Sequence, residues 1–197
     1  MTQDEAQGGP APLPSSDGFS DDTTNGVVFW PVALAVTMAD VITKAMAEYT
    51  LRPVGMPYSV VGDTVRLTLV YNPGAAFGLH LGPYSRWIFL ALTGGVLTIL
   101  WRLYKQTRDR DNLRTFALAL VCGGAVGNAL DRLRSPDGVV DFLDLGSSTV
   151  RWPTFNLADV AVSVGAFLLA WVLWGDDVAD AASAGTPARV SAQHELP

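Results

Sequence analysis

Carboxylates and amides gather in the second half of the chain, directly beside long apolar runs. Residues 123–144 read GGAVGNALDRLRSPDGVVDFLD, where a glycine-rich stretch gives way to Asp131, Arg132 and Asp141. Asp159 follows near the start of the next apolar run. Two carboxylates that meet from separate segments suit acid–base chemistry, because they cannot both ionise at close range and one keeps its proton. Such a pair would equally suit a cation site.

The composition indicates a membrane protein. The 197 residues are 49% hydrophobic and 16% charged, whereas an ordinary soluble domain has about 25% charged residues. The charges cluster and leave long uncharged intervals, and a helix that spans a bilayer needs about 20 mostly apolar residues. Four transmembrane helices are therefore expected, at residues 27–47, 84–104, 113–133 and 155–174.

The connection between the first two spans carries the pattern of a strand. TVRLTLVY (64–71) alternates between two faces, which is typical of a half-buried strand, and the turn residues Asn72, Pro73 and Gly74 follow it. The sequence therefore predicts a mainly α membrane protein with four transmembrane helices. A small extracytoplasmic β-sheet is expected between the first and second helices, in residues 50–83.

The distribution of basic residues indicates the orientation of the spans. WRLYKQTRDRDNLR (101–114), between the second and third spans, carries five basic residues and is expected in the cytoplasm. Both termini then face the cytoplasm, whereas the 48–83 and 134–154 connections face outward.

Both ends of the chain are acidic and rich in small residues. Residues 1–26 hold no Lys or Arg, and residues 175–197 combine acidic side chains with Ala and Ser, so both are expected to be disordered tails around a membrane domain at 27–174. The net charge of −6 gives no electrostatic basis for binding nucleic acid. One cysteine, Cys122, and two histidines supply too few ligands for a zinc site.

The third span is short of apolar residues. Phe116–Leu130 is an uninterrupted run of fifteen residues, or about 22 Å of helix, against a hydrocarbon thickness of about 30 Å. To cross, the helix must also use Asn128, Asp131 and Arg132, which share one face at i, i+3 and i+4.

The first and fourth spans place polar groups at the same level. The fourth span has the same shortage, which brings Asn156 and Asp159 to the outer boundary, and Asp40 with Lys44 forms an i, i+4 pair in the first span. Ionisable groups therefore collect at the outward end of the bundle. Carboxylates at membrane depth are costly and mark a functional site by default.

Structural roles account for some of these residues equally well. Asp40 with Lys44, and Asp131 with Arg132, would serve as structural ion pairs, while Asp137 and Asp144 are expected to be solvated loop residues. The alternative functions are a small four-helix ion or proton transporter that uses the Asp cluster, or a non-catalytic scaffold. A transporter needs polar groups through to the inner side, where these spans are almost purely apolar.

Five motifs resemble, in order and spacing, those of the bacterial lipoprotein signal peptidases. These are type II signal peptidases, a family of membrane aspartyl proteases, and the resemblance covers about residues 27–174. The motifs are ADVITK (39–44), VYNPGAAFG (70–78), GGAVGNALDR (123–132), VVDFLDL (139–145) and FNLADVAVSVG (155–165).

The resemblance implies a site and a substrate. The catalytic pair would be Asp141 and Asp159, near the extracytoplasmic face of the bacterial cytoplasmic membrane. The substrate would be a prolipoprotein with a diacylglyceryl-modified cysteine, cut on the N-terminal side of that cysteine. The enzyme is expected to be a monomer among membrane lipids, without metal or cofactor. Supporting roles around the site would fall to Asn72, Asn128, Asp131, Arg132, Asn156, Asp40 and Lys44.

Overall fold

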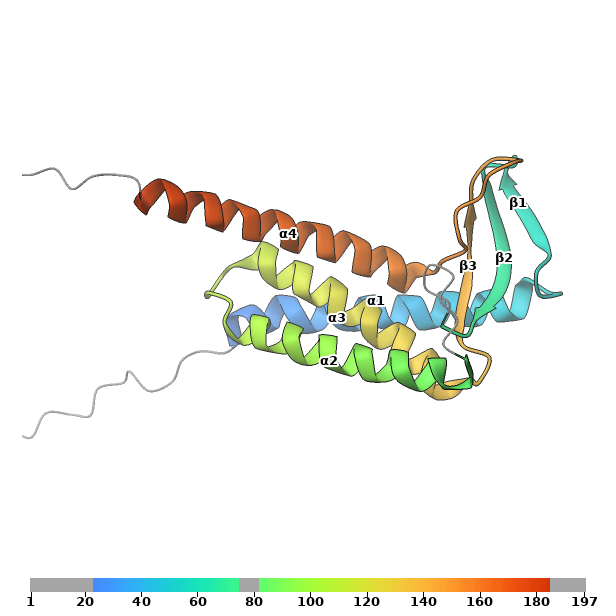
Figure 1. Cartoon of the computed structure of the whole chain (residues 1–197), viewed down its shortest axis with the longest axis horizontal. Helices are drawn as coiled ribbons and strands as arrows, with labels where there is room; N and C mark the ends of the chain where they lie inside the picture. The colour runs from blue at the N-terminus through green and yellow to red at the C-terminus, as the bar shows by residue number, and fades with distance from the viewer. Residues whose placement is uncertain (1–22, 75–81, 185–197) are drawn as a thin grey trace, which may run out of the picture.

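Four long helices lie side by side, with a small sheet at one end of the bundle (Figure 1). The computed structural model describes residues 23–74 and 82–184. All four helices are long and apolar enough to cross a membrane. The predicted mainly α fold with four membrane helices and a small sheet is confirmed. The helices are α1 (Thr23–Thr50), α2 (Ser85–Lys105), α3 (Asn112–Arg134) and α4 (Leu157–Ala184).

Helix α3 is the centre of the bundle and the most buried of the four spans. Its glycines let the neighbouring helices approach closely, as small residues do between membrane helices. A Cβ atom on Gly124 would lie 2.5 Å from the carbonyl oxygen of Ala158 in α4, and one on Gly127 would collide with the Asp40 carboxylate of α1. Helices α1 and α4 therefore bring their polar groups against one face of α3.

The sheet has three antiparallel strands in the order β1-β2-β3. Strands β1 (Pro57–Val61) and β2 (Val65–Asn72) lie between α1 and α2, as predicted. A further strand, β3 (Val139–Leu145), comes from the 134–154 connection, which the sequence analysis left without a strand. Its first four residues are all buried, so it lacks the alternation that marked β2.

An apolar cluster fixes the sheet on the end of α1. Ala47 and Leu51 from the end of the helix pack with Leu69 of β2 and with Val140 and Phe142 of β3. Burial of these side chains aligns β3 over the end of the bundle. The register pairs Val70 of β2 with the residue between those two, Asp141.

The first and last helices extend beyond the predicted spans. Helix α1 begins at Thr23 and α4 continues to Ala184, so helix replaces part of each segment expected to be a tail. The reason at the C-terminal end is that residues 175–184 are rich in Ala, a strong helix former. The rest of both tails lies outside the described residues, as do residues 75–81, which include the last four residues of the VYNPGAAFG motif.

Candidate active site

Asp141 and Asp159 approach the end of the bundle from two different elements. Asp141 lies in the middle of β3 and is 3% exposed, and Asp159 lies in the first turn of α4. The residue that connects them is Asn156. Its side-chain Nδ2 donates to Oδ1 of Asp141 at 2.7 Å, and its backbone N–H donates to Oδ2 of Asp159 at 3.1 Å. One fully buried residue thus holds both carboxylates.

Asn128 of α3 holds Asp159 from the other side. Its Nδ2 donates to Oδ1 of Asp159 at 2.8 Å. Its Oδ1 accepts from Nδ2 of Asn156 at 3.1 Å and from Nζ of Lys44 at 2.9 Å. The amide orientation of Asn128 is thereby set by donors on two other elements.

Asn72, the last residue of β2, holds Asp141. Its Nδ2 donates to Oδ2 of Asp141 at 3.1 Å, while its Oδ1 accepts from the backbone N–H of Gly74 at 3.0 Å. The turn expected at 72–74 therefore orients the side chain that contacts the carboxylate. Each oxygen of Asp141 accepts from a different asparagine.

Lys44 is a buried cation that pairs with two further aspartates, Asp40 and Asp131. Its Nζ lies 2.7 Å from Oδ2 of Asp40 and 2.9 Å from Oδ2 of Asp131. Asp40 accepts the backbone N–H of Ala158 at 3.0 Å, and Asp131 accepts that of Val140 at 3.2 Å. Ala158 and Val140 directly precede Asp159 and Asp141, so one lysine links the backbone positions of both. The expected Asp40–Lys44 pair is present.

The expected Asp131–Arg132 ion pair is not the arrangement found. Asp131 pairs with Lys44 and, at 3.5 Å, with Arg134. Arg132 instead donates from Nη1 to the carbonyl of Asn128 at 3.2 Å and lies 5.5 Å from the centre of the Phe89 ring. The reason is that consecutive residues of a helix point to different faces.

The two acidic residues expected to be solvated differ. Asp137 is exposed. Asp144 is 7% exposed, accepts from Thr68 Oγ1 at 2.9 Å and pairs with Nε of Arg151. The prediction for Asp144 was wrong because it placed this residue in a solvated loop, whereas Asp144 belongs to strand β3 and is buried.

Burial and charge both act on Asp141. Burial raises the pKa of its carboxyl to about 6, and the negative charge of Asp159 acts in the same direction. The hydrogen bonds from Asn72 and Asn156 lower the pKa but do not cancel the rise. Asp141 is thus a carboxyl that takes up a proton far more readily than an ordinary aspartic acid.

A cavity of about 230 Å³ opens beside Asp159, between α2, α3 and α4. Asn128, Arg132 and Asp159 form its polar part, while Leu92 and Val96 continue it along α2. The Asp159 carboxylate therefore lies next to a hydrophobic surface. Among residues 23–74 and 82–184 there is no group of three His, Cys, Asp or Glu side chains able to hold a metal.

All nine predicted site residues belong to this end of the bundle. The sequence analysis missed two residues there. Phe89 lies under the Arg132 guanidinium, and Arg151 donates to the carbonyl oxygens of Asp63, Ser147 and Asp144, which ties together the turns of the sheet. Phe89 sits in a uniformly apolar span, so nothing in the sequence distinguishes it from a lipid-facing residue.

Known proteins are similar to this chain over most of its length. The family model of signal peptidase II matches residues 32–175. The lipoprotein signal peptidase of Pelotomaculum thermopropionicum is 41% identical over 145 residues, which are 74% of this chain and 90% of that protein. The one from Mycolicibacterium smegmatis is 43% identical over 152 residues, 74% of this chain and 61% of that protein.

A solved structure agrees in fold. A bacterial membrane enzyme determined by the in meso method at 2.3 Å is 25% identical, with a TM-score of 0.66 over 85% of this chain and 93% of that one. The chain belongs to the signal peptidase II family of aspartic-type membrane peptidases.

Proposed function

We propose that the protein removes signal peptides from prolipoproteins whose cysteine already carries a diacylglyceryl group. The cut falls on the N-terminal side of that cysteine, and Asp141 and Asp159 do the chemistry. The observation that carries the proposal is the double contact of Asn156, because a single residue bonds to two carboxylates from different elements.

The reaction divides between the two carboxyls. The ionised member accepts a proton from water, which attacks the scissile carbonyl. The protonated member gives its proton to the carbonyl oxygen. As the tetrahedral intermediate collapses, the proton taken from water passes to the leaving amine. The proton on the former carbonyl oxygen returns to the other carboxyl, which restores the starting state of the pair. We assign the proton to Asp141, since burial and the charge of Asp159 raise its pKa. No metal is needed in this scheme, because the carboxyl pair supplies both the acid and the base.

The cavity beside Asp159 supports a lipid-linked substrate. Its apolar part follows α2 from Phe89 to Val96, which is about 10 Å of helix. Hydrocarbon of a substrate would remain beside these side chains while the peptide bond lies against the polar end. Arg132 and Asn128 line that end and are placed to contact the polar linker between the acyl chains and the cysteine.

The orientation follows the charge of the short α2–α3 loop. We propose that this loop and both termini face the cytoplasm and that the sheet faces outward, in the bacterial cytoplasmic membrane. The precursor then meets the aspartates on the outer side, after its mature part has crossed. The transporter alternative is not favoured, because the polar network ends within the half of the bundle nearest the sheet.

The experiment compares two forms of one precursor with the purified full chain. A lipid-modified prolipoprotein and the same chain without the diacylglyceryl group are incubated separately, and the products are identified by mass. The proposal predicts a new N-terminal lipidated cysteine from the first and at least tenfold slower cleavage of the second. Equal cleavage of both forms, or a cut at another bond, would overturn it.

A further inference from the structure

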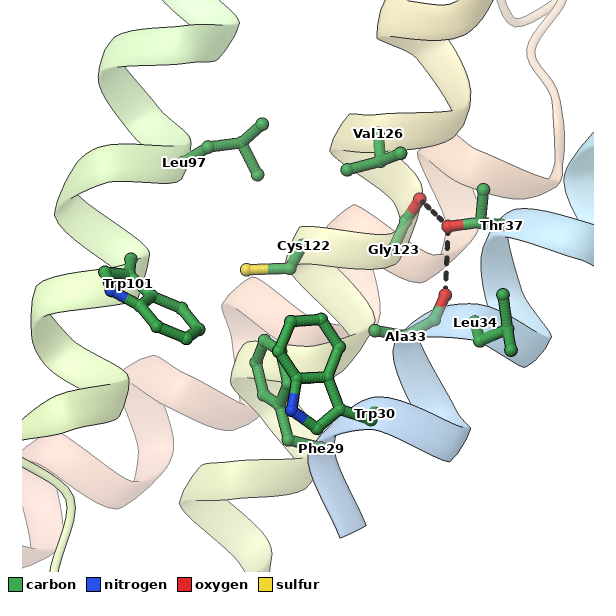
Figure 2. Close-up of a pocket in the computed structure, with 10 residues that line it drawn as sticks. All are labelled: Phe29, Trp30, Ala33, Leu34, Thr37, Leu97, Trp101, Cys122, Gly123 and Val126. Atoms are coloured by element: carbon green, nitrogen blue, oxygen red, sulfur yellow. Dashed lines mark hydrogen bonds between the residues drawn. The ribbon is translucent and has the colours of Figure 1, made fainter. Parts of the chain in front are cut away.

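A second cavity lies in the half of the bundle away from the sheet, between α1, α2 and α3 (Figure 2). This sheet-distal groove has a volume of about 340 Å³ and shares no residue with the polar network around Asp141 and Asp159. Figure 2 shows Trp30 of α1 and Trp101 of α2 on its two sides, with Cys122 of α3 pointing toward α2.

The interior of the sheet-distal groove offers hydrocarbon contacts. Its one hydroxyl group, that of Thr37, already lies at hydrogen-bonding distance from the carbonyls of Ala33 (2.9 Å) and Gly123 (3.0 Å) (Figure 2). A ligand with polar atoms inside the groove would lose water without gaining partners. The part of an occupant that enters is therefore hydrocarbon.

The dimensions select a single extended chain. The lining residues of α1 run from Phe29 to Thr37, about 12 Å along the helix axis. One leaflet of the hydrocarbon core is about 15 Å deep, half of about 30 Å. A helix about 10 Å across would need roughly 900 Å³ over the same length. A helix from a second copy would exceed 340 Å³ and could enter only by its side chains, whereas an acyl chain fits along its length.

Positive charge lies at the mouth of the sheet-distal groove. Leu97, Trp101 and Lys105 follow at four-residue steps on one face of α2, and the first two line the groove. Nζ of Lys105 lies 6.0 Å from the centre of the Trp101 ring, and Arg102 is in the same last turn. Basic side chains beside interfacial tryptophans attract anionic lipid headgroups.

We propose that the sheet-distal groove is a binding site for one anionic phospholipid of the adjoining leaflet. One acyl chain fills the space between α1, α2 and α3, and the phosphate lies against Lys105 and Arg102. The lipid completes the packing of α1 against α2, so it stabilises the folded protein by binding it selectively.

Native mass spectrometry of the full chain in detergent tests the site. Phosphatidylglycerol and phosphatidylethanolamine with the same acyl chains are added in equal amounts. The wild type is expected to retain one phosphatidylglycerol. Leu97→Trp fills the groove and should lower that occupancy at least fivefold. Ile99→Trp, two residues along on an exposed face of α2, is the matched control and should retain the lipid.

The headgroup contact is tested by a further variant, and a second measurement uses the wild type alone. Lys105→Gln should reduce the preference for phosphatidylglycerol at least threefold while phosphatidylethanolamine still binds. Independently of any variant, tryptophan fluorescence of the wild type should be quenched more strongly by phosphatidylglycerol brominated on its acyl chains than by the matching phosphatidylethanolamine. Equal retention by Leu97→Trp and Ile99→Trp, equal quenching by the two lipids, or a dimer that Leu97→Trp abolishes would overturn the proposal.

Discussion

Nδ2 of Asn156 lies 2.7 Å from Oδ1 of Asp141, and this bond joins the sheet to the start of α4. The backbone N–H of Asn156 donates to Asp159, and the backbone N–H of Asp159 donates to Oδ1 of Asn156 at 3.0 Å. Asn156 therefore bonds to both aspartates, to Asp141 through its side chain and to Asp159 through its backbone and its side chain.

Removal of the Asn156 side chain should impair catalysis while the protein still inserts and folds. We expect Asn156→Ala to lower kcat/KM at least 100-fold, since a misplaced acid–base pair loses most of its contribution of about 10²–10⁴. Asn156→Asp should be no better, because it places a third carboxyl group beside Asp141 and Asp159. Cleavage kinetics on a lipid-modified precursor, with thermal unfolding in detergent, measure both effects. Near wild-type kcat/KM in Asn156→Ala would contradict the positioning role.

Lys44 should control stability as well as activity. Lys44→Met leaves the Asp40 carboxylate buried without its cation and leaves Asp131 with only the longer contact to Arg134, and breaking a buried pair costs about 3–5 kcal/mol. Folded yield and Tm are expected to fall. Combination with Asp40→Asn, which removes one of the buried charges, should recover part of the Tm. If the double variant is no more stable than Lys44→Met, the charge account is wrong.

Arg132 should affect activity more than folding. Asp131 keeps Lys44 and Arg134 when Arg132 is removed, so Arg132→Ala is expected to retain most of the folded yield. Its kcat/KM should fall because the cavity beside Asp159 loses its cation. Arg132→Lys should recover little, since an ammonium group cannot reproduce the planar contact with Phe89. The measurement is Tm beside kcat/KM, and a loss of Tm as large as that of Lys44→Met would argue against this division.

The pH dependence should report Asp141. Its pKa is raised to about 6, so the protonated form is present below that pH and is lost as pH rises through it. A reaction that needs this proton should show kcat/KM for the free enzyme falling about tenfold per pH unit on the alkaline side. A profile measured from pH 5 to 9 on a precursor without titrating groups near the cut checks this. A rate that rises steadily with pH would assign the proton elsewhere.

Sequence patterns were sufficient to predict the four helices and strand β2. They did not predict the strand in the connection between α3 and α4. Composition and span length placed Asp159 and Asn128 at one level, because short apolar runs leave little choice of depth. Strand β3 was not predicted, since its buried residues break the period of two, and so the burial of Asp144 was missed. The pairing of Asp131 with Lys44 depends on how α1 crosses α3, which spacing within one helix does not determine.

We propose that Asp141 and Asp159 together cleave the precursor. The cleavage rates of Asp141→Asn and Asp159→Asn test this beside Asp137→Asn, a matched change at an exposed aspartate in the same connection as Asp141. We expect folded protein in all three, at least 1,000-fold slower cleavage by the first two (about 4 kcal/mol in the barrier) and wild-type cleavage by the third. Cleavage by Asp141→Asn or Asp159→Asn within tenfold of the wild-type rate would contradict it.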